Sequence, residues 1–233
     1  MVKRDLTEAE ITDSIPDLWQ PLTPEQRDFL AKNFTVQNYK RNEIIYCEGE
    51  IPTHFMCLLN GKVKIYKDGI GGRSQIIRII QNKEFFAYRA YFAEEPYVTT
   101  AAACEPCTVC LIPMPTILQL IKENSQLAMF FIRQLSKDLG ISDRRTVNLT
   151  QKHVRGRLAE SLLFLKERYG LEEDQATLSI YLSREDLASL SNMTSSNVIR
   201  TLSNFAAEKL IAIDGRKIKL IEEEKLKKIS KIG

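Results

Sequence analysis

The sequence contains no long uninterrupted apolar run, and this absence excludes the simplest kinds of membrane protein. Residues 1–19, MVKRDLTEAEITDSIPDLW, alternate charged and apolar side chains and contain neither a transmembrane helix nor a signal peptide. Histidine is also scarce, with two residues in 233. Metal-dependent oxygenases and isomerases on β-rich domains need two or three histidines with a carboxylate. We therefore expect a cytoplasmic protein that has no membrane segment and is not an enzyme.

A strong excess of one charge is missing as well, since the formal net charge is +3. Whether the protein binds a polyanion must therefore be judged from where the charges lie, rather than from their sum. Five cysteines are an odd number without a secretory signal, so reduced thiols are expected. Three of them, Cys104, Cys107 and Cys110, have the spacing of a metal or iron–sulfur ligand set, or of a redox switch. Because Pro106 predicts a hairpin between them, buried structural cysteines are the simpler interpretation.

The length of 233 residues predicts two domains. Between Tyr39 and Ile112, apolar residues come in short runs separated by Gly, Asn and Pro, which is typical of an all-β domain. Val63 and Ile65 alternate with lysines at period two, as a half-buried strand requires. Asn60–Gly61 and Asp68–Gly72 are turn sequences, spaced as in successive hairpins of a sandwich or jelly roll.

A proline-free segment, Ser125–Thr150, predicts a helix about 38 Å long, which exceeds what a small domain needs for its core. We expect it to pair with a second copy in a homodimer through residues 125–150; the alternative is a helix that folds back on the β-domain. The seam predicted from coiled-coil-like spacing contains Phe131, Leu135, Ser142 and Leu149, with Leu139 nearby. The sequence His153–Gly156 is expected to break this helix, because glycine in a helix costs about 1 kcal/mol relative to alanine.

A second amphipathic helix is expected over Arg157–Tyr169, with Gly170 as its C-cap. The stretch LSREDLASLSNMTSSNVIRTLSNF, from Leu182 to Phe205, then predicts two short helices joined by a tight turn. Ser183 caps the first helix, Asn192 enters the left-handed region, and Thr194 caps the second helix. The second helix buries Val198, Leu202 and Phe205 and leaves Ser195, Ser196, Asn197 and Arg200 outward.

This spacing is typical of a helix-turn-helix, in which the second helix enters the DNA major groove. Arg200 can donate twice to a guanine, a contact worth about 1 to 3 kcal/mol of discrimination. Residues 208–220 predict a strand, an Asp-Gly turn and a second strand, which together form a wing that can meet phosphates. A helical hairpin with a solvated polar face is the alternative. The candidate DNA-binding residues are Ser183, Arg184, Thr194, Ser195, Ser196, Asn197, Arg200, Arg216 and Lys217.

The motifs IYCEGE, LLNGKVKIY, VRGRLA and SREDLASLSNMTSSNVIRTL follow one another in this order. From about residue 22 to 220 the chain thereby resembles the cyclic-AMP receptor protein and fumarate–nitrate regulator (Crp/Fnr) family. The resemblance implies an α+β fold with three parts: a β-jelly-roll sensor over 1–124, a long dimerisation helix over 125–152 and a winged helix-turn-helix over 153–233. It also implies that a small-molecule effector reorients a homodimer on two-fold symmetric double-stranded DNA, with RNA polymerase as a further partner.

By position, Ser195, Ser196 and Arg200 correspond to the base-reading residues of the family. Asn192 replaces the usual turn glycine, and Ser191 and Thr201 stand at core sites that are usually apolar. A ligand-responsive interaction module that does not bind an operator is the alternative function.

The sensor departs from the cyclic-nucleotide binders of the family, which carry Gly-Glu-Leu and Arg-Ser-Ala segments. Here the corresponding residues are Ala87-Tyr88-Arg89 and Val98-Thr99-Thr100, so the charge-assisted bonds to an anionic nucleotide are lost. We therefore do not expect cyclic AMP as the effector. An anionic or aromatic effector is an alternative to a simple ion pair of Arg89 with Glu94 or Glu95. The candidate effector pocket comprises Tyr88, Arg89, Tyr97, Thr99 and Thr100, completed by Ser142 and Asp143, with Tyr91 as a further possible wall.

Two cofactors known in the family are also not expected. Its iron–sulfur sensors place cysteines near the amino terminus, and residues 1–46 contain none. A haem would need an axial ligand, for which only His54 and His153 are available. The effector is thus unidentified at the level of sequence.

Overall fold

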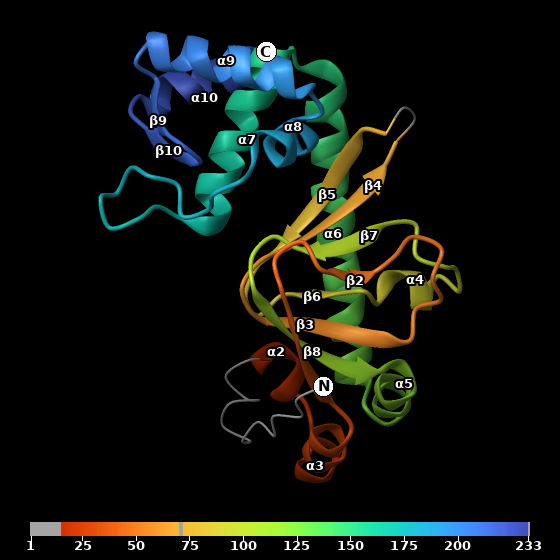
Figure 1. The fold of residues 1–233 in the computed structure, drawn as a ribbon. Helices are drawn as coiled ribbons and strands as arrows, with labels where there is room; N and C mark the ends of the chain where they lie inside the picture. The colour runs from red at the N-terminus through yellow and green to blue at the C-terminus, as the bar shows by residue number, and fades with distance from the viewer. Residues whose placement is uncertain (1–14, 70–71, 233) are drawn as a thin grey trace. The chain divides into compact units, whose positions relative to one another are not determined.

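The computed structural model describes residues 15–69 and 72–232 (Figure 1). Residues 1–14, where no signal peptide is expected, and residues 70–71 of the glycine-rich turn lie outside the described residues. Contacts divide the chain into two compact units: Met1–Asp68 with Ile77–Gly140, and Gly69–Ile76 with Ile141–Gly233. Within the described residues, no helix is long and apolar enough to cross a membrane.

The β-domain consists of two four-stranded sheets (Figure 1). The first sheet has the spatial order β1 (Thr35–Tyr39), β8 (Cys107–Pro113), β3 (His54–Asn60) and β6 (Phe85–Phe86). The second has the order β2 (Ile44–Tyr46), β7 (Thr100–Ala103), β4 (Val63–Asp68) and β5 (Ser74–Ile80). Strand β8 runs antiparallel to β1 and β3, and β7 runs antiparallel to β2 and β4. The predicted all-β domain is confirmed.

The turn at Asn60–Gly61 joins two different sheets, so the hairpin expected there is wrong. Strand β3 pairs with β8 and β6, whereas β4 pairs with β7. Gly61 has a φ of +95°, and a Cβ atom on it would lie 2.6 Å from Cβ of Cys107 and 2.7 Å from the carbonyl oxygen of Pro106. Glycine therefore allows both the left-handed backbone and the close approach at which the chain crosses between the sheets.

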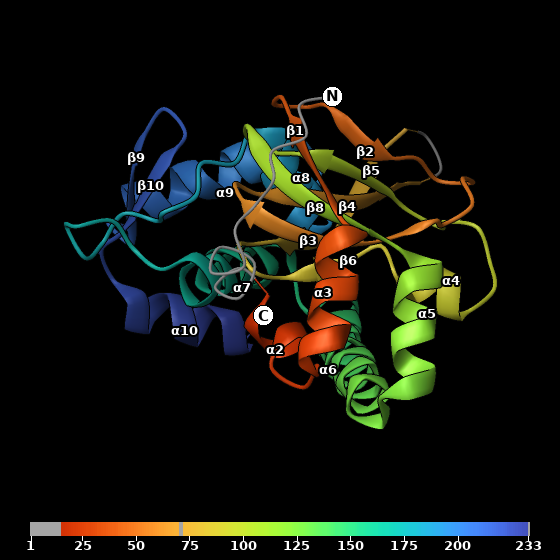
Figure 2. The same cartoon turned by 90° about the horizontal axis from the view of Figure 1, so that it is seen from below.

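Alternation along the strands divides the apolar side chains between two cores. Met56 and Leu58 of β3 lie in one core with Val63 and Ile65 of β4, the strand whose alternation the sequence predicted. Phe55 of β3 faces the other core, which is covered by helices (Figure 2). These helices are α2 (Pro16–Trp19), α3 (Pro24–Lys32), α5 (Met114–Glu123) and the first part of α6 (Ser125–Gln151). The short helix α4 (Arg89–Phe92) follows β6.

Helix α6 packs on the β-domain through part of the predicted dimer seam. Phe131 is only 3% exposed, and its ring centroid lies 5.3 Å from that of Phe55. Leu135 is partly buried against the same core. The seam drawn through Phe131 is therefore wrong, because this face of the helix already has a partner within the chain. The exposed apolar residues on this part of α6 are Met129 (43%), Ile132 (54%) and Leu139 (63%).

The predicted break after α6 is confirmed, but the reason given for it is wrong. Helix α6 ends at Gln151 and α7 (Val154–Tyr169) begins after His153, whose backbone is extended. Gly156 is buried inside α7. The cost of one glycine in a helix, about 1 kcal/mol, is small enough for packing to override it. Gly170 ends α7 with a φ of +73°, as predicted for a C-cap.

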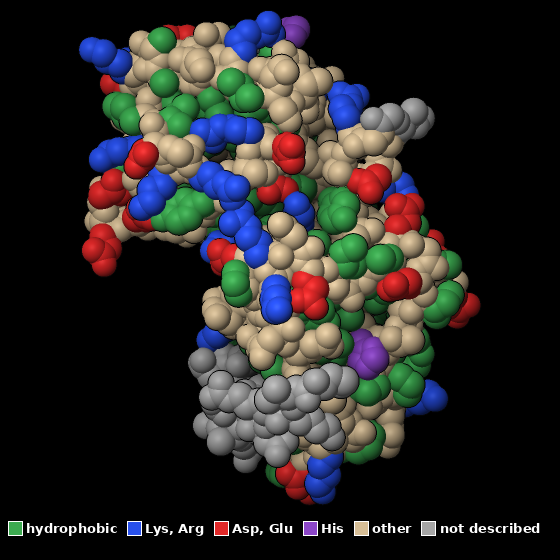
Figure 3. Space-filling model, in the orientation of Figure 1, with side chains coloured by type: hydrophobic (Ala, Val, Ile, Leu, Met, Phe, Trp, Pro, Cys, Tyr) green, Lys and Arg blue, Asp and Glu red, His purple; other side chains and the backbone are tan. Residues whose placement is uncertain are grey.

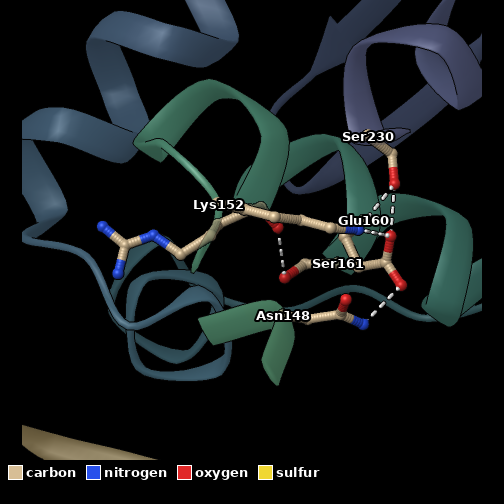
Figure 4. Close-up of polar contacts among 6 residues, drawn as sticks. Asn148, Lys152, Glu160, Ser161 and Ser230 are labelled. Carbon is tan, nitrogen blue, oxygen red and sulfur yellow. Dashed lines mark hydrogen bonds and ion pairs between the residues drawn. The ribbon is translucent and has the colours of Figure 1, made fainter. Parts of the chain in front are cut away.

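A polar cluster joins three helices at this break (Figure 4). The carboxylate of Glu160 on α7 accepts hydrogen bonds from Asn148 Nδ2 on α6 (3.0 Å) and from Nζ of Lys152, which directly follows α6 (2.8 Å). It also accepts a short hydrogen bond from the hydroxyl of Ser230 on α10 (Glu223–Ile232). One carboxylate thus links the end of α6, the middle of α7 and the carboxyl-terminal helix.

Candidate nucleic-acid interface

The two short helices predicted from the sequence are present as α8 (Arg184–Ser191) and α9 (Ser195–Ala207). Asn192 lies between them with φ 51° and ψ 53°, the left-handed conformation that allows the tight turn. Thr194 caps α9, because its hydroxyl accepts from the backbone N–H of Asn197 at 3.2 Å. The helix-turn-helix geometry is confirmed.

Apolar packing fixes the inner side of α9 against the rest of the second unit. Val198, Leu202 and Phe205 are buried, as predicted. Ser191, at a core site for which the sequence analysis expects an apolar residue, is also buried. Its hydroxyl donates to Ser161 Oγ of α7 at 2.9 Å. Because this hydroxyl has a partner, the serine is accommodated without an unsatisfied polar group.

The outer side of α9 carries the predicted polar residues. Ser196 and Arg200 are exposed, and Ser195 and Asn197 are partly exposed. Arg200 Nη2 donates to Oδ1 of Asn197, one helical turn earlier, at 2.9 Å. This bond fixes one edge of the guanidinium and leaves its other donors available for a ligand.

One exposed residue on α9 was missed by the sequence analysis. Ile199 is 52% exposed, although it directly follows the buried Val198. The signal was present in the spacing: buried residues recur at 198, 202 and 205, and position 199 falls outside that stripe.

The predicted wing is formed by β9 (Ile211–Asp214) and β10 (Lys217–Leu220), which pair antiparallel. Gly215 in the turn has a φ of +56°, and Arg216 beside it is exposed. Lys217 Nζ lies 3.5 Å from a carboxylate oxygen of Glu172 and also lies over the ring of Tyr181. In Figure 3, Lys and Arg side chains near the wing, at the upper left, stand beside Asp and Glu side chains.

A second lysine of the wing also has an acidic partner. Lys219 Nζ lies 3.2 Å from a carboxylate oxygen of Asp174. Hydrogen bonds from the backbone N–H groups of Thr177 and Ala176 hold the pKa of Asp174 well below its usual range. The carboxylate of Asp174 therefore stays charged at any ordinary pH.

The remaining two candidates, Ser183 before α8 and Arg184 at its first position, have partners within the second unit. The hydroxyl of Ser183 accepts from the backbone N–H of Asp186 at 3.0 Å and caps α8 as predicted. Arg184 Nη2 donates to the carbonyl oxygen of Gly215 at 2.8 Å. Arg184 thereby supports the turn of the wing.

The predicted effector residues that belong to the first unit separate into small groups. Arg89 pairs with Glu95 at 2.7 Å, which is the simpler of the two interpretations considered. The rings of Tyr97 and Tyr46 stack with centroids 3.9 Å apart, and the hydroxyl of Tyr46 lies 3.5 Å from Thr99 Oγ1. Thr100 Oγ1 accepts from the backbone N–H of Glu48.

Tyr88 is buried on a different side, with its ring centroid 5.6 Å from that of Phe131. Its hydroxyl donates to Asp138 Oδ2 at 3.4 Å, and Arg78 Nη1 lies 2.6 Å from the same oxygen. Burial and the nearby Asp138 charge raise the pKa of Tyr88. Ser142 and Asp143 are exposed residues of the second unit.

The cysteines of the Cys-x-x-Cys-x-x-Cys run do not converge. Cys107 packs in the core between the sheets, whereas Cys110 packs in the core under the helices. Burial raises the pKa of Cys107 to about 11 and that of Cys110 to about 12. Within residues 15–69 and 72–232, no group of three His, Cys, Asp or Glu side chains is arranged to hold a metal ion.

Comparison with known families gives two matches. The cyclic nucleotide-binding domain matches residues 36–124, and the Crp-like helix-turn-helix domain matches residues 156–229. The CRP-like cAMP-activated global transcriptional regulator of Mycobacterium tuberculosis is 23% identical over 210 residues, which are 90% of this chain and 94% of that protein. The global nitrogen regulator of Nostoc sp. is 25% identical over 186 residues, 78% of this chain and 83% of that protein. Both relatives are transcription regulators by name.

Solved structures agree on the fold. FixK2 from Bradyrhizobium japonicum superposes with a TM-score of 0.76 at 22% identity, over 84% of this chain and 96% of that one. A putative transcriptional regulator of the Crp/Fnr family from Eubacterium rectale superposes with a TM-score of 0.78 at 17% identity, over 94% of this chain and 99% of that one. The two domain matches, in the same order along the chain, together with the relatives and the capped helix-turn-helix, show that the chain belongs to the Crp/Fnr family of DNA-binding transcription regulators.

Proposed function

We propose that the protein binds a two-fold symmetric operator as a homodimer, with α9 reading base edges in the major groove. The observation that carries this proposal is the state of Arg200. Its guanidinium is exposed and is held on one edge by Asn197 at 2.9 Å. A guanidinium with a fixed orientation and free donors suits bidentate bonding to O6 and N7 of a guanine.

The short residues around Arg200 support this role. Thr194, Ser195 and Ser196 begin α9 and are small enough for the helix to approach bases or phosphates closely. The backbone N–H groups at the helix start also favour a phosphate oxygen. These residues would therefore set the depth of the helix in the groove, while Arg200 supplies the discrimination.

In the proposed complex, the wing contacts the phosphate backbone mainly through Arg216. This residue is exposed next to the turn, and within the described residues it forms no ion pair. Lys217 would have to exchange Glu172 for a phosphate. Phosphate contacts contribute affinity without sequence preference.

Dimerisation is proposed through the exposed apolar residues of α6. Met129, Ile132 and Leu139 recur at intervals of three and seven and are 43 to 63% exposed. Such a stripe on a long helix suits knobs-into-holes packing against a second copy. A homodimer would present two copies of α9, which explains why a two-fold operator is expected.

We assign effector sensing to the β-domain over residues 1–124, connection to 125–152 and DNA reading to 153–233. The effector is a small molecule other than cyclic AMP, since Tyr88 and Val98 stand where the nucleotide binders of the family carry Glu and Arg. The pocket residues named from the sequence stay a prediction. RNA polymerase is proposed as the partner through which operator binding acts.

The proposal is tested by selecting duplexes from a random library with the full-length protein and measuring affinities by fluorescence anisotropy. We expect Arg200→Ala to weaken the selected site by about 1 to 3 kcal/mol and to lose preference at one base pair per half-site. Arg216→Ala should weaken all duplexes alike and reduce the slope of log K against log salt by about 1 per subunit.

Lys32→Ala is the matched control, because it removes an exposed cation from α3 in the first unit. It should change neither the affinity nor the slope. Failure to enrich any sequence, or equal losses from Arg200→Ala on every duplex, would contradict the proposal.

A further inference from the structure

Ile199 is an apolar side chain on a helix face that is otherwise polar. It is 52% exposed, whereas Val198 and Leu202 on the same helix are buried. The packing of α9 on the second unit therefore uses the neighbouring stripe and does not need Ile199. On the helix that the proposed function places in the major groove, this side chain is therefore available for a contact with DNA.

The neighbours of Ile199 leave its side chain accessible. Residues three before and four after it on a helix are its nearest neighbours on the surface. These are Ser196 and Ser203, both exposed and both short. The branched side chain consequently projects beyond them from the first turns of α9.

We propose that Ile199 contacts the C5-methyl group of a thymine in each half-site, and this inference rests on the proposed function. In the major groove, thymine is the one base that presents a methyl group, and apolar side chains are its natural partners. The serines beside Ile199 cannot supply such a contact, because they are polar and shorter. Ile199 is therefore a specificity-determining residue with a chemistry different from that of Arg200.

The position of the thymine follows from helix geometry. Ile199 and Arg200 are consecutive, and α9 advances by 1.5 Å per residue while duplex DNA advances by 3.4 Å per base pair. The two side chains therefore reach bases that lie within about two base pairs of each other. The half-site should contain a guanine read by Arg200 with a thymine close to it.

The test removes one methyl group at a time. Each thymine of the selected operator is replaced by deoxyuridine in both half-sites, and binding of the full-length protein is measured by anisotropy. For wild type, one replacement within about two base pairs of the guanine should raise Kd about fourfold per half-site, or about 15-fold for both, as expected from burial of one methyl group. With Ile199→Ala, the thymine and deoxyuridine duplexes should bind equally.

Ile221→Ala is the matched control. Ile221 follows the wing in the same unit and is 50% exposed, so the substitution removes the same atoms from a similar environment. This variant should keep the full response to deoxyuridine. Circular dichroism of all variants should be unchanged, because neither isoleucine is buried.

The outcomes separate this inference from the proposed function. Absence of any enriched operator would contradict the proposed function itself. An operator that depends on Arg200, combined with the same deoxyuridine response in wild type and Ile199→Ala, would overturn the thymine contact alone. Loss of self-association in Ile199→Ala, measured by sedimentation, would instead assign Ile199 to a protein interface and would also overturn it.

Discussion

Replacing Glu160 by glutamine should loosen the carboxyl-terminal helix from α7. The carboxylate accepts from Asn148 through one oxygen and from Lys152 and Ser230 through the other (Figure 4). A glutamine amide can keep its single oxygen on Lys152 and Ser230, but it loses the negative charge and turns its NH2 group toward the NH2 group of Asn148. The side chains of Lys152 and Glu160 are 19% and 36% exposed. In burial the pair thus lies between an exposed ion pair, which is worth less than about 1 kcal/mol, and a buried one. We therefore expect Glu160→Gln to lower the free energy that holds α10 on α7 by about 1 to 2 kcal/mol.

The loss of stability caused by Glu160→Gln should depend on pH. Partial burial favours the protonated form of Glu160, but the hydrogen bonds from Lys152 and Ser230 and the charge of Lys152 outweigh it and lower the pKa of Glu160 below 4.5. A carboxyl with a lowered pKa in the folded state contributes stability above its unfolded pKa and loses it as pH falls. The difference in stability between wild type and Glu160→Gln should therefore have its full size at pH 7 and become smaller below pH 4.5.

Hydrogen exchange of the α10 amides measures this directly. A loss of 1 to 2 kcal/mol corresponds to exchange about 5 to 30 times faster in Glu160→Gln than in wild type. The control is Glu224→Gln, where a carboxylate 78% exposed pairs with Lys227 on the same helix, and it should change exchange little. Equal rates in Glu160→Gln and wild type at pH 7, or a difference that persists at the lowest pH where both stay folded, would refute the reasoning.

Further predictions concern the dimer, the thiols and the turn. Leu139→Glu should give monomers in sedimentation and abolish operator binding, while Ile51→Glu, at an apolar residue 70% exposed in the first unit, should stay dimeric. The pKa of Cys110 is raised to about 12 by burial, so at pH 8 a thiol reagent should modify the partly exposed Cys47 well before Cys110. Asn192→Gly should leave urea stability nearly unchanged, whereas Asn192→Ala should lower it by about 1 kcal/mol, and equal effects would argue against the left-handed turn.

Local chemistry made the helix-turn-helix predictable from the sequence. The caps at Ser183 and Thr194 and the left-handed Asn192 depend on the residues next to them, and all three are present in the structure. Periodicity likewise identified the buried side of α9. Such features are set within one or two helical turns, where a single sequence carries enough information.

Features that depend on distant segments were harder to predict. The spacing of Phe131 fitted a dimer seam, but Phe55, far away in the chain, covers it. The turn at Gly61 suggested a hairpin, because the sequence does not say that β4 pairs with β7. Periodicity alone cannot assign an apolar face to one of several possible partners.

The acidic partners of the wing lysines have a thermodynamic consequence. A lysine that leaves Glu172 or Asp174 for a DNA phosphate frees one counterion from the DNA but uncovers a carboxylate, which attracts a cation in turn. The two lysines therefore add little to the salt dependence of binding, although they add to the positive charge counted from the sequence. Operator affinity should fall less steeply with ionic strength than the number of cations on this surface implies.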